Sequence, residues 1–218
     1  LENIERLKVK PTEGEFHLLH YLNEHLDDSY EVFFNPFLDG DRPDFIILKE
    51  GVSIFVIEVK DYNLSNYQVD NYNKWSVKSA QGTSRIASPQ SQAFTYKKNM
   101  YQLHLPVLGL GQLTNRNFFN LVLPLVYMHK GSKSQINQLY SQAENELRQQ
   151  SQDLFKQHGS KSINHETYNK RSDGISGVQK RISRDKAMVY ANDQLSMLIS
   201  KIKSFKSHVL FDDRVYDD

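Results

Sequence analysis

Three charged residues border two otherwise apolar stretches of the sequence, and their types and spacing could do chemistry. Asp44 opens the first stretch, and Glu58 and Lys60 close the second. Residues 45–48 and 52–59 are rich in β-branched and aromatic side chains and flank a Lys-Glu-Gly turn signal, so they predict an antiparallel hairpin. Pairing of the two strands would bring Asp44 beside Glu58. Two carboxylates and a lysine at one sheet edge could hold a hard divalent metal ion and activate a water.

Side chains alternate along a strand, so Glu58 and Lys60 share one face while Val59 points to the opposite layer. A carboxylate buried on that face is costly unless a cation or a metal ion compensates it. The simpler alternative is an ordinary ion pair where a strand reaches solvent, which is the more common meaning of an isolated Glu-x-Lys pattern. The Pro43-Asp44 pair, one hairpin upstream, favours the catalytic interpretation.

These residues resemble a known pattern. Pro43-Asp44 followed by Glu58-Val59-Lys60 is similar to the signature of the PD-(D/E)XK phosphodiesterase superfamily, and within it the chain most resembles the nuclease-related domain, NERD. The resemblance covers roughly the first half of the chain. Further positions that carry it are Glu13 to Glu15, Gly51-Val52, Asp61-Tyr62, Trp75 and residues 89–92.

The resemblance implies a Mg²⁺- or Mn²⁺-dependent deoxyribonuclease with a restriction-endonuclease-like fold. Interspersed strands and helices independently predict an α/β or α+β class, with a mixed central sheet flanked by helices. In the implied site, Asp44, Glu58 and the backbone carbonyl of Val59 hold the metal ion, and Glu15 adds a ligand directly or through water. Lys60 orients the attacking water and stabilises charge on the phosphorane.

A helix that carries Glu15 is predicted just upstream. Residues 16–26 have leucines at helical spacing, and Glu15 falls on the same stripe, where an unpaired carboxylate would be unfavourable. The alternative is a first-turn glutamate favoured by the helix dipole. The three histidines of this helix, His17, His20 and His25, have no i, i+4 pair, so we interpret them as surface or interfacial residues.

A second helix is predicted to start at the Ser-Pro pair of residues 88–89. Gln92 and Tyr96 lie on one face of it and resemble the Q-x-x-x-Y signature of the exonuclease branch. The resemblance implies that Gln92 positions water or Lys60 and that Tyr96 contacts a phosphate. Lys97 is a further candidate for gripping phosphate. The alternative is a glutamine on the helix shoulder beside a half-buried tyrosine.

The second half of the chain is predicted to be mainly helical. Residues 118–128 form a buried strand in which Pro124 suggests an edge or a bulge. Residues 157–177 have few apolar side chains and are interpreted as a loop or mobile segment, and residues 184–205 as a closing helix. Residues 130–157 keep a helical apolar stripe, which consists of Ile136, Leu139, Tyr140, Ala143, Leu147 and Leu154. Trp75, the only tryptophan, is predicted to be a structural anchor.

Charge is unevenly distributed along these 218 residues, although the net charge is only +1. Residues 1–60 carry 6 basic and 13 acidic side chains, and residues 148–186 carry 9 basic and 4 acidic ones. An acidic site with a basic flank suits an enzyme that acts on a polyanion, and Lys180, Arg181 and Arg184 are candidate DNA contacts. A solvated basic helix surface is the alternative. The absence of cysteine excludes disulfides and thiolate metal sites.

The organisation that we expect is a nuclease-like core at residues 1–130 and a polar, basic helical extension at residues 131–206 that completes the same domain. Residues 207–218 would be an acidic tail or a linker to a missing C-terminal domain, plausibly a helicase. DNA is the expected partner, and a non-catalytic nucleic-acid-binding module is the alternative function. No apolar segment of membrane-spanning length and no signal-peptide pattern is present, so we expect a soluble, cytoplasmic protein without membrane contact.

Overall fold

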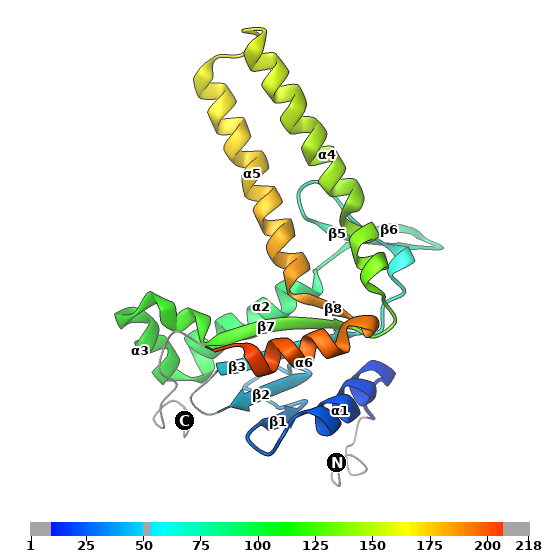
Figure 1. The fold of residues 1–218 in the computed structure, drawn as a ribbon, viewed down its shortest axis with the longest axis vertical. Coiled ribbons are helices and arrows are strands. Elements are labelled where there is room, and N and C mark those ends of the chain that lie inside the picture. Colours follow the sequence, from blue (N-terminus) through cyan, green and yellow to red (C-terminus); the bar gives the residue numbers. More distant parts are fainter. Residues whose placement is uncertain (1–9, 50–52, 207–218) are drawn as a thin grey trace. The chain divides into compact units, whose positions relative to one another are not determined.

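A computed structural model describes residues 10–49 and 53–206 (Figure 1). The chain divides by its contacts into two compact units that are interleaved along the sequence. Unit 1 contains Leu1–Tyr62, Pro89–Gly131 and Val189–Asp218, and unit 2 contains Asn63–Ser88 and Ser132–Met188. Units defined by contacts are not folding domains, so the expected division into a core at residues 1–130 and an extension at residues 131–206 stays a prediction. The expected tail at residues 207–218 lies outside the described residues.

Unit 1 is built on a five-stranded mixed sheet with the strand order β1-β2-β3-β7-β8. The first three strands are antiparallel neighbours, whereas β3, β7 and β8 are parallel. The predicted α/β or α+β class with a mixed sheet is therefore confirmed. The strands are β1 (Glu31–Phe34), β2 (Phe45–Lys49), β3 (Ser53–Lys60), β7 (Val122–Met128) and β8 (Val189–Ala191).

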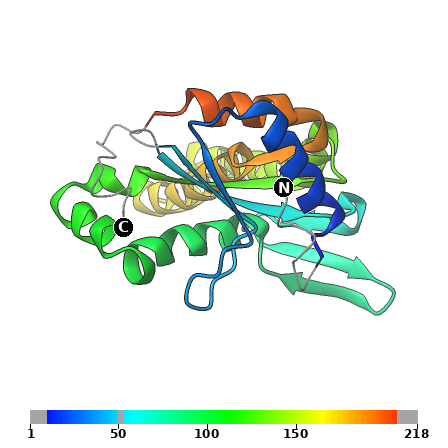
Figure 2. The same ribbon diagram turned by 90° about the horizontal axis from the view of Figure 1, so that it is seen from below.

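Helices cover both faces of this sheet (Figure 2). Ile57 and Val59 of β3 pack in one apolar cluster with residues of α1 and α6, whereas Val56 packs in a second cluster with residues of α3 and the η3 turn. The predicted alternation along β3 is thus confirmed. The helical elements are α1 (Glu13–His25), α2 (Pro89–Asn99), η3 (Met100–His104), α3 (Pro106–Thr114), η4 (Arg116–Asn120), η5 (Asn192–Gln194) and α6 (Leu195–Ser204).

The predicted hairpin is confirmed, because β2 and β3 are antiparallel with Phe45 opposite Ile57. Its connecting residues, 50–52, lie outside the described residues. Pro124 lies on β7, which is not an outer strand, since β7 lies between β3 and β8. However, β8 pairs only with the last three residues of β7, so Pro124 has β3 as its one described neighbour. A proline has no N–H to donate, and it is tolerated where one side of the strand is unpaired.

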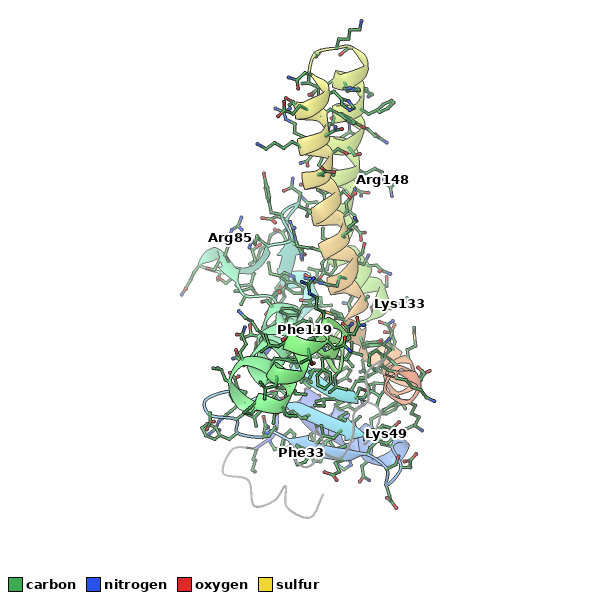
Figure 3. The ribbon with its side chains drawn as sticks, turned by 90° about the vertical axis from the view of Figure 1, so that its left-hand side faces the viewer. Phe33, Lys49, Arg85, Phe119, Lys133 and Arg148 are labelled. Atoms are coloured by element: carbon green, nitrogen blue, oxygen red, sulfur yellow. The ribbon has the colours of Figure 1, made fainter. Side chains whose placement is uncertain are left out.

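Unit 2 combines a small antiparallel sheet with a helical hairpin (Figure 3). Trp75 is 2% exposed and packs edge-on against Tyr67 and Tyr140, so its structural role is confirmed. The apolar stripe predicted for residues 130–157 is the buried face of α4. The elements are η2 (Leu64–Asn66), β4 (Tyr67–Val69), β5 (Trp75–Ser79), β6 (Gly82–Ile86), α4 (Lys133–Gly159) and α5 (His165–Ala187).

Two predictions for the second half were wrong. Residues 157–177 are mostly helical, because α4 continues to Gly159 and α5 begins at His165. Each helix of the pair buries only a narrow stripe on the other, so a polar composition does not prevent helix formation. Residues 184–205 are not one helix, since β8 and η5 intervene before α6. In the described part of the chain, no helix is both long and apolar enough to cross a membrane.

Candidate active site

Asp44 and Glu58 lie side by side at the edge of β2 and β3. Phe45 pairs with Ile57, so the residues just outside this pair, Asp44 and Glu58, face one another across the two strands. The Val59 N–H donates a hydrogen bond of 2.6 Å to Asp44 Oδ2. Glu58 is 2% exposed, and its Oε1 accepts a hydrogen bond from Lys60 Nζ. Its other oxygen, Oε2, is buried without a hydrogen-bond partner.

The electrostatics of the pair favour a bound proton at neutral pH. Burial raises the pKa of Asp44 to about 8, with a further contribution from the negative charge of Glu58. Burial also raises the pKa of Glu58, although Lys60 acts in the opposite direction. Burial alone would lower the pKa of Lys60, but its hydrogen bond to Glu58 and the charge of Glu58 raise it. Lys60 therefore stays cationic while the carboxylates compete for a proton.

Glu15 lies near this pair but has a structural task as well. Its carboxylate accepts a 2.7 Å hydrogen bond from the Thr12 N–H, and the Thr12 hydroxyl accepts one from the Glu15 N–H. This reciprocal arrangement caps the first turn of α1. The charge of Glu15 also contributes to the raised pKa values of Asp44 and Glu58, which places it within electrostatic reach of both.

Gln92 and Tyr96 of α2 face the same site. Gln92 Nε2 donates a 3.0 Å hydrogen bond to the Tyr96 hydroxyl, which in turn donates one of 3.2 Å to the Arg42 carbonyl. The pKa of Tyr96 is raised by burial and also by the charges of Glu58 and Asp44. The structure therefore brings Glu15, Asp44, Glu58, Lys60, Gln92 and Tyr96 together.

Lys97 lies in a different, apolar environment that does not favour gripping phosphate, and this role stays a prediction. The side chain is 6% exposed, and its ammonium lies 4.0 Å from the centre of the Phe119 ring. Burial lowers its pKa to about 8. One residue after Tyr96, the helix has turned by about 100°, so Lys97 points into a different environment from its neighbour.

The three basic candidates of α5 belong to unit 2. Lys180 and Arg181 are exposed, and Arg181 borders a groove on this unit. The Arg184 guanidinium donates two hydrogen bonds, of 3.0 and 3.1 Å, to Asp185 Oδ1. Phosphate contact by these residues stays a prediction.

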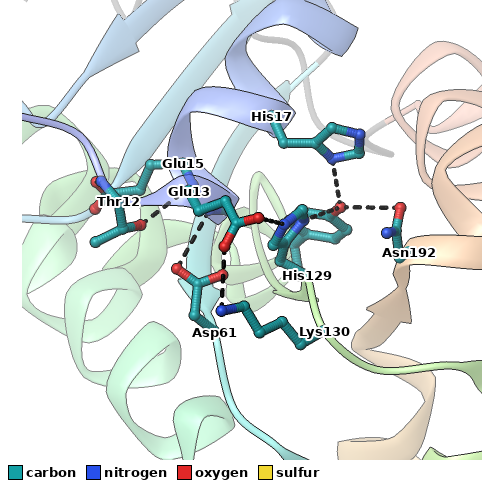
Figure 4. Close-up of polar contacts among 10 residues, drawn as sticks. Thr12, Glu13, Glu15, His17, Asp61, His129, Lys130 and Asn192 are labelled. Carbon is teal, nitrogen blue, oxygen red and sulfur yellow. Dashed lines mark hydrogen bonds and ion pairs between the residues drawn. The ribbon is translucent and has the colours of Figure 1, made fainter.

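A polar cluster that the sequence analysis missed holds the first turn of α1 against the ends of β3 and β7 (Figure 4). The Gly14 N–H donates a 3.2 Å hydrogen bond to Asp61 Oδ2. Glu13 forms an ion pair of 3.1 Å with Lys130 and lies 3.7 Å from His129 Nε2. These partners lie within two residues of the end of a strand, and charged residues at that place were the one signal that could have revealed them.

The Tyr127 hydroxyl is the centre of the same cluster. It lies 2.8 Å from His17 Nδ1, 3.2 Å from His129 Nδ1 and 3.4 Å from Asn192 Oδ1. Burial raises the pKa of Tyr127, so the hydroxyl stays neutral. The His17 side chain is thus held by a hydrogen bond within the fold, which a surface or interfacial residue would not need. The cluster ties α1 to the carboxyl ends of β7 and β8, and so fixes the helix that carries Glu15.

The oxygen ligands of this site fit a hard divalent cation that takes only a few ligands from the protein. Within residues 10–49 and 53–206, no group of three or more histidine, aspartate and glutamate side chains is arranged to hold a metal ion. Glu15 therefore does not complete a three-carboxylate site. Mg²⁺ usually needs only one or two protein carboxylates and keeps several waters. Asp44 and Glu58, with the unpartnered Oε2 of Glu58, meet that requirement.

A mixed sheet that carries a buried glutamate, a partly buried aspartate and a lysine at one edge defines a nuclease-like α+β protein. The family model described as the nuclease-related domain matches residues 10–129. This match spans more than half of the chain, so the protein belongs to the nuclease-related domain family, as the resemblance predicted. No curated protein and no solved structure matches the chain.

The close approach at Gly14 leads to a stability prediction. A Cβ at this position would lie 2.5 Å from Asp61 Oδ1 and 2.8 Å from His129 Cβ. We therefore expect Gly14→Ala to lower the free energy of unfolding by about 1–3 kcal/mol, the usual cost of overpacking. Thermal or urea denaturation measures this loss. The matched control is Gly159→Ala, where a Cβ meets nothing within 4 Å. Equal stability of the two variants would contradict the proposed tight packing.

The raised pKa of Asp44 predicts how stability depends on pH. Between its ordinary value of 3.8 and about 8, the folded protein holds a proton that the unfolded chain has lost. The free energy of unfolding of the metal-free protein should therefore fall as the pH rises through this range. Asp44→Asn should reduce the slope, because the amide does not titrate. Urea denaturation in chelator at several pH values tests this, with the exposed Asp28→Asn as the control that keeps the wild-type slope.

Proposed function

We propose that this protein is a metal-dependent nuclease that hydrolyses DNA phosphodiester bonds. The observation that carries the proposal is the position of the partly buried Asp44 beside the buried Glu58, with one oxygen of Glu58 unpartnered and Lys60 hydrogen-bonded to the other. Two adjacent buried carboxylates repel one another and lose hydration, so they cost folding free energy. Such an arrangement is expected where function requires it. Membership of a nuclease-related family supports the same chemistry.

Each residue of the site has a proposed role. Asp44, Glu58 and the Val59 carbonyl would hold Mg²⁺ or Mn²⁺, and Glu15 would act through water while it caps α1. The metal ion, when bound, supplies a Lewis acid and lowers the pKa of a coordinated water. Lys60 orients the attacking water and stabilises the charge that develops on the phosphorus oxygens.

Gln92 and Tyr96 act on the substrate side of the site. The Gln92 amide fixes the Tyr96 hydroxyl, which now donates to the Arg42 carbonyl. Tyr96 can redirect this hydrogen bond to a phosphate oxygen when DNA is bound. We further propose, from the family resemblance, that a C-terminal helicase or other domain of the parent chain delivers the DNA strand. The alternative is a module that binds DNA without cleaving it.

Substitution of the three central residues tests catalysis. Asp44→Ala, Glu58→Ala and Lys60→Ala should each lower the rate of DNA cleavage by at least about 100-fold, because each removes a charge that acts on the transition state. Asp44→Ala should melt at or above the wild-type temperature without metal at pH 9, above the pKa of about 8, since repulsion from Glu58 is then relieved. Cleavage of supercoiled and linear DNA with Mn²⁺ is the assay.

The exposed residues Glu24 and Lys98 provide controls of matched charge. Glu24→Ala and Lys98→Ala should cleave at the wild-type rate. Wild-type cleavage by any of the three central variants would refute the assigned site. DNA binding by the wild type without metal-dependent cleavage would instead support the non-catalytic module.

Metal binding should be linked to proton release. Because Asp44 holds a proton below a pKa of about 8, a cation that binds near neutral pH must displace it. We expect Mn²⁺ titrations in buffers of different ionisation enthalpy to show proton release, and the apparent affinity to rise with pH. Glu58→Gln should lose this binding, whereas the control Glu24→Gln should keep it. Equal binding by both variants would place the metal ion elsewhere.

A further inference from the structure

Unit 2 carries a groove of about 740 Å³ between α4, α5 and the turn that connects β4 to β5. Its floor is apolar and includes Leu147 and Val178, which are buried. Its rim is polar and includes Tyr72 from the turn and Arg171 and Arg181 from α5. An apolar floor with a few convergent polar groups is the usual composition of a binding site. The residues that line this groove belong to unit 2, whereas the proposed catalytic residues belong to unit 1.

Tyr72 is an exposed aromatic residue on a rigid turn. Its side chain is 69% exposed, whereas its N–H and the Lys74 N–H both donate 2.9 Å hydrogen bonds to Asp70 Oδ1. Asn73, at a φ of 62°, donates from its amide to Asp185 Oδ2 at 2.6 Å. This hydrogen bond ties the turn to α5. The backbone that carries Tyr72 is therefore fixed at the groove before any ligand arrives, which lowers the entropic cost of stacking on its ring.

The charge along the groove is positive. Arg171 and Arg181 are ten residues apart on α5, which corresponds to about 15 Å along the helix axis. The one carboxylate that lines the groove, Asp153, accepts a 3.0 Å hydrogen bond from Gln149 and lies 4.0 Å from Lys156. Two guanidinium groups in a row suit a ligand with repeated phosphates, because each can bind a phosphate in a bidentate manner.

Gly174 keeps the middle of the groove open. It lies in the interior of α5, where a glycine costs about 1 kcal/mol relative to alanine. A Cβ at this position would meet nothing within 4 Å, so packing within the protein does not require glycine. Gly174 lines the groove between the two arginines. A larger side chain there would project into the space that a ligand would fill.

We propose that this groove binds a single strand of DNA, an inference that rests on the proposed nuclease function and names the form of its substrate. Tyr72 stacks on an unpaired base, and Arg171 and Arg181 contact successive parts of the phosphate backbone. A single strand fits better than a duplex, because stacking on an aromatic side chain needs a base whose face is free. The groove thus gives the nuclease a second hold on its substrate, formed by residues of unit 2.

The aromatic contact is tested by fluorescence anisotropy of the whole chain with labelled oligothymidylate in chelator, where no cleavage occurs. Tyr72→Ala should weaken binding by about 10-fold, as expected when one base–aromatic stack is removed. The control is Phe155→Ala, which removes another exposed aromatic side chain of unit 2 that does not line this groove. An equal effect of the two substitutions would overturn the role of Tyr72.

The arginines are tested by two double variants that change the charge equally. Arg171→Gln with Arg181→Gln should weaken binding more than Arg148→Gln with Lys170→Gln, which alters exposed residues of the same helices outside the groove. The salt dependence should also flatten, by about 0.7 in logarithmic slope for each phosphate that the variant no longer neutralises. The same affinity and slope in both double variants would show a general charge effect and overturn the proposal.

Gly174→Leu tests whether a side chain that blocks the groove weakens binding without lowering the stability of the fold. Leucine is a good helix former, so this variant should melt at or above the wild-type temperature while it binds oligothymidylate more weakly. Gly174→Ala should gain stability with a smaller decrease in affinity. Unchanged affinity in Gly174→Leu would mean that the groove is not the binding surface. Equally strong competition by duplex DNA or by polyglutamate would overturn the assignment to a single strand.

These outcomes are independent of catalysis. If Asp44→Ala cleaves normally but Tyr72→Ala and Gly174→Leu lose single-strand binding, the proposed active site fails and the groove stands. If Asp44 is essential while the groove variants bind as the wild type does, the groove fails and the active site stands.

Discussion

The confinement of two carboxylates beside one lysine is the constraint on which the other features of unit 1 depend. Asp44 and Glu58 meet because β2 and β3 pair in one register, and a slip of one residue would turn both to the opposite face. The apolar clusters above and below β3 hold that register. Folding thus supplies the free energy needed to keep like charges together. Lys60 compensates only part of this cost, because it donates to one oxygen of Glu58.

Sequence patterns predicted the features of the fold that depend on neighbouring residues. The hairpin, the face shared by Glu58 and Lys60, and the buried stripe of α4 each follow from side-chain periodicity, and the structure confirms them. Tyr96 contacts Gln92, as their helical spacing predicts. Such features need only a few neighbouring residues. The resemblance to the family motif linked Asp44 to Glu58 and Lys60 as parts of one predicted site.

Other features depend on interactions between distant segments, and no local pattern encodes them. Lys97 resembles any helix lysine until Phe119, more than 20 residues later, covers its ammonium. The three residues of β8 are too few to show an alternating pattern, and they form a strand through their parallel pairing with β7. The cluster around Tyr127 joins residues from three separate segments. In each case the decisive partner is known only after the chain has folded.

The connection between β7 and β8 has a consequence for how this architecture can vary. These strands are parallel neighbours in unit 1, yet the chain between them contains α4 and α5, which pack against each other as a helical hairpin in unit 2. Because α4 and α5 run in opposite directions, the chain leaves the hairpin at the same end at which it enters. Paired insertions or deletions of whole turns could therefore lengthen or shorten the hairpin while both strand ends stay where they are. Its length is free to change during evolution without any adjustment in the sheet.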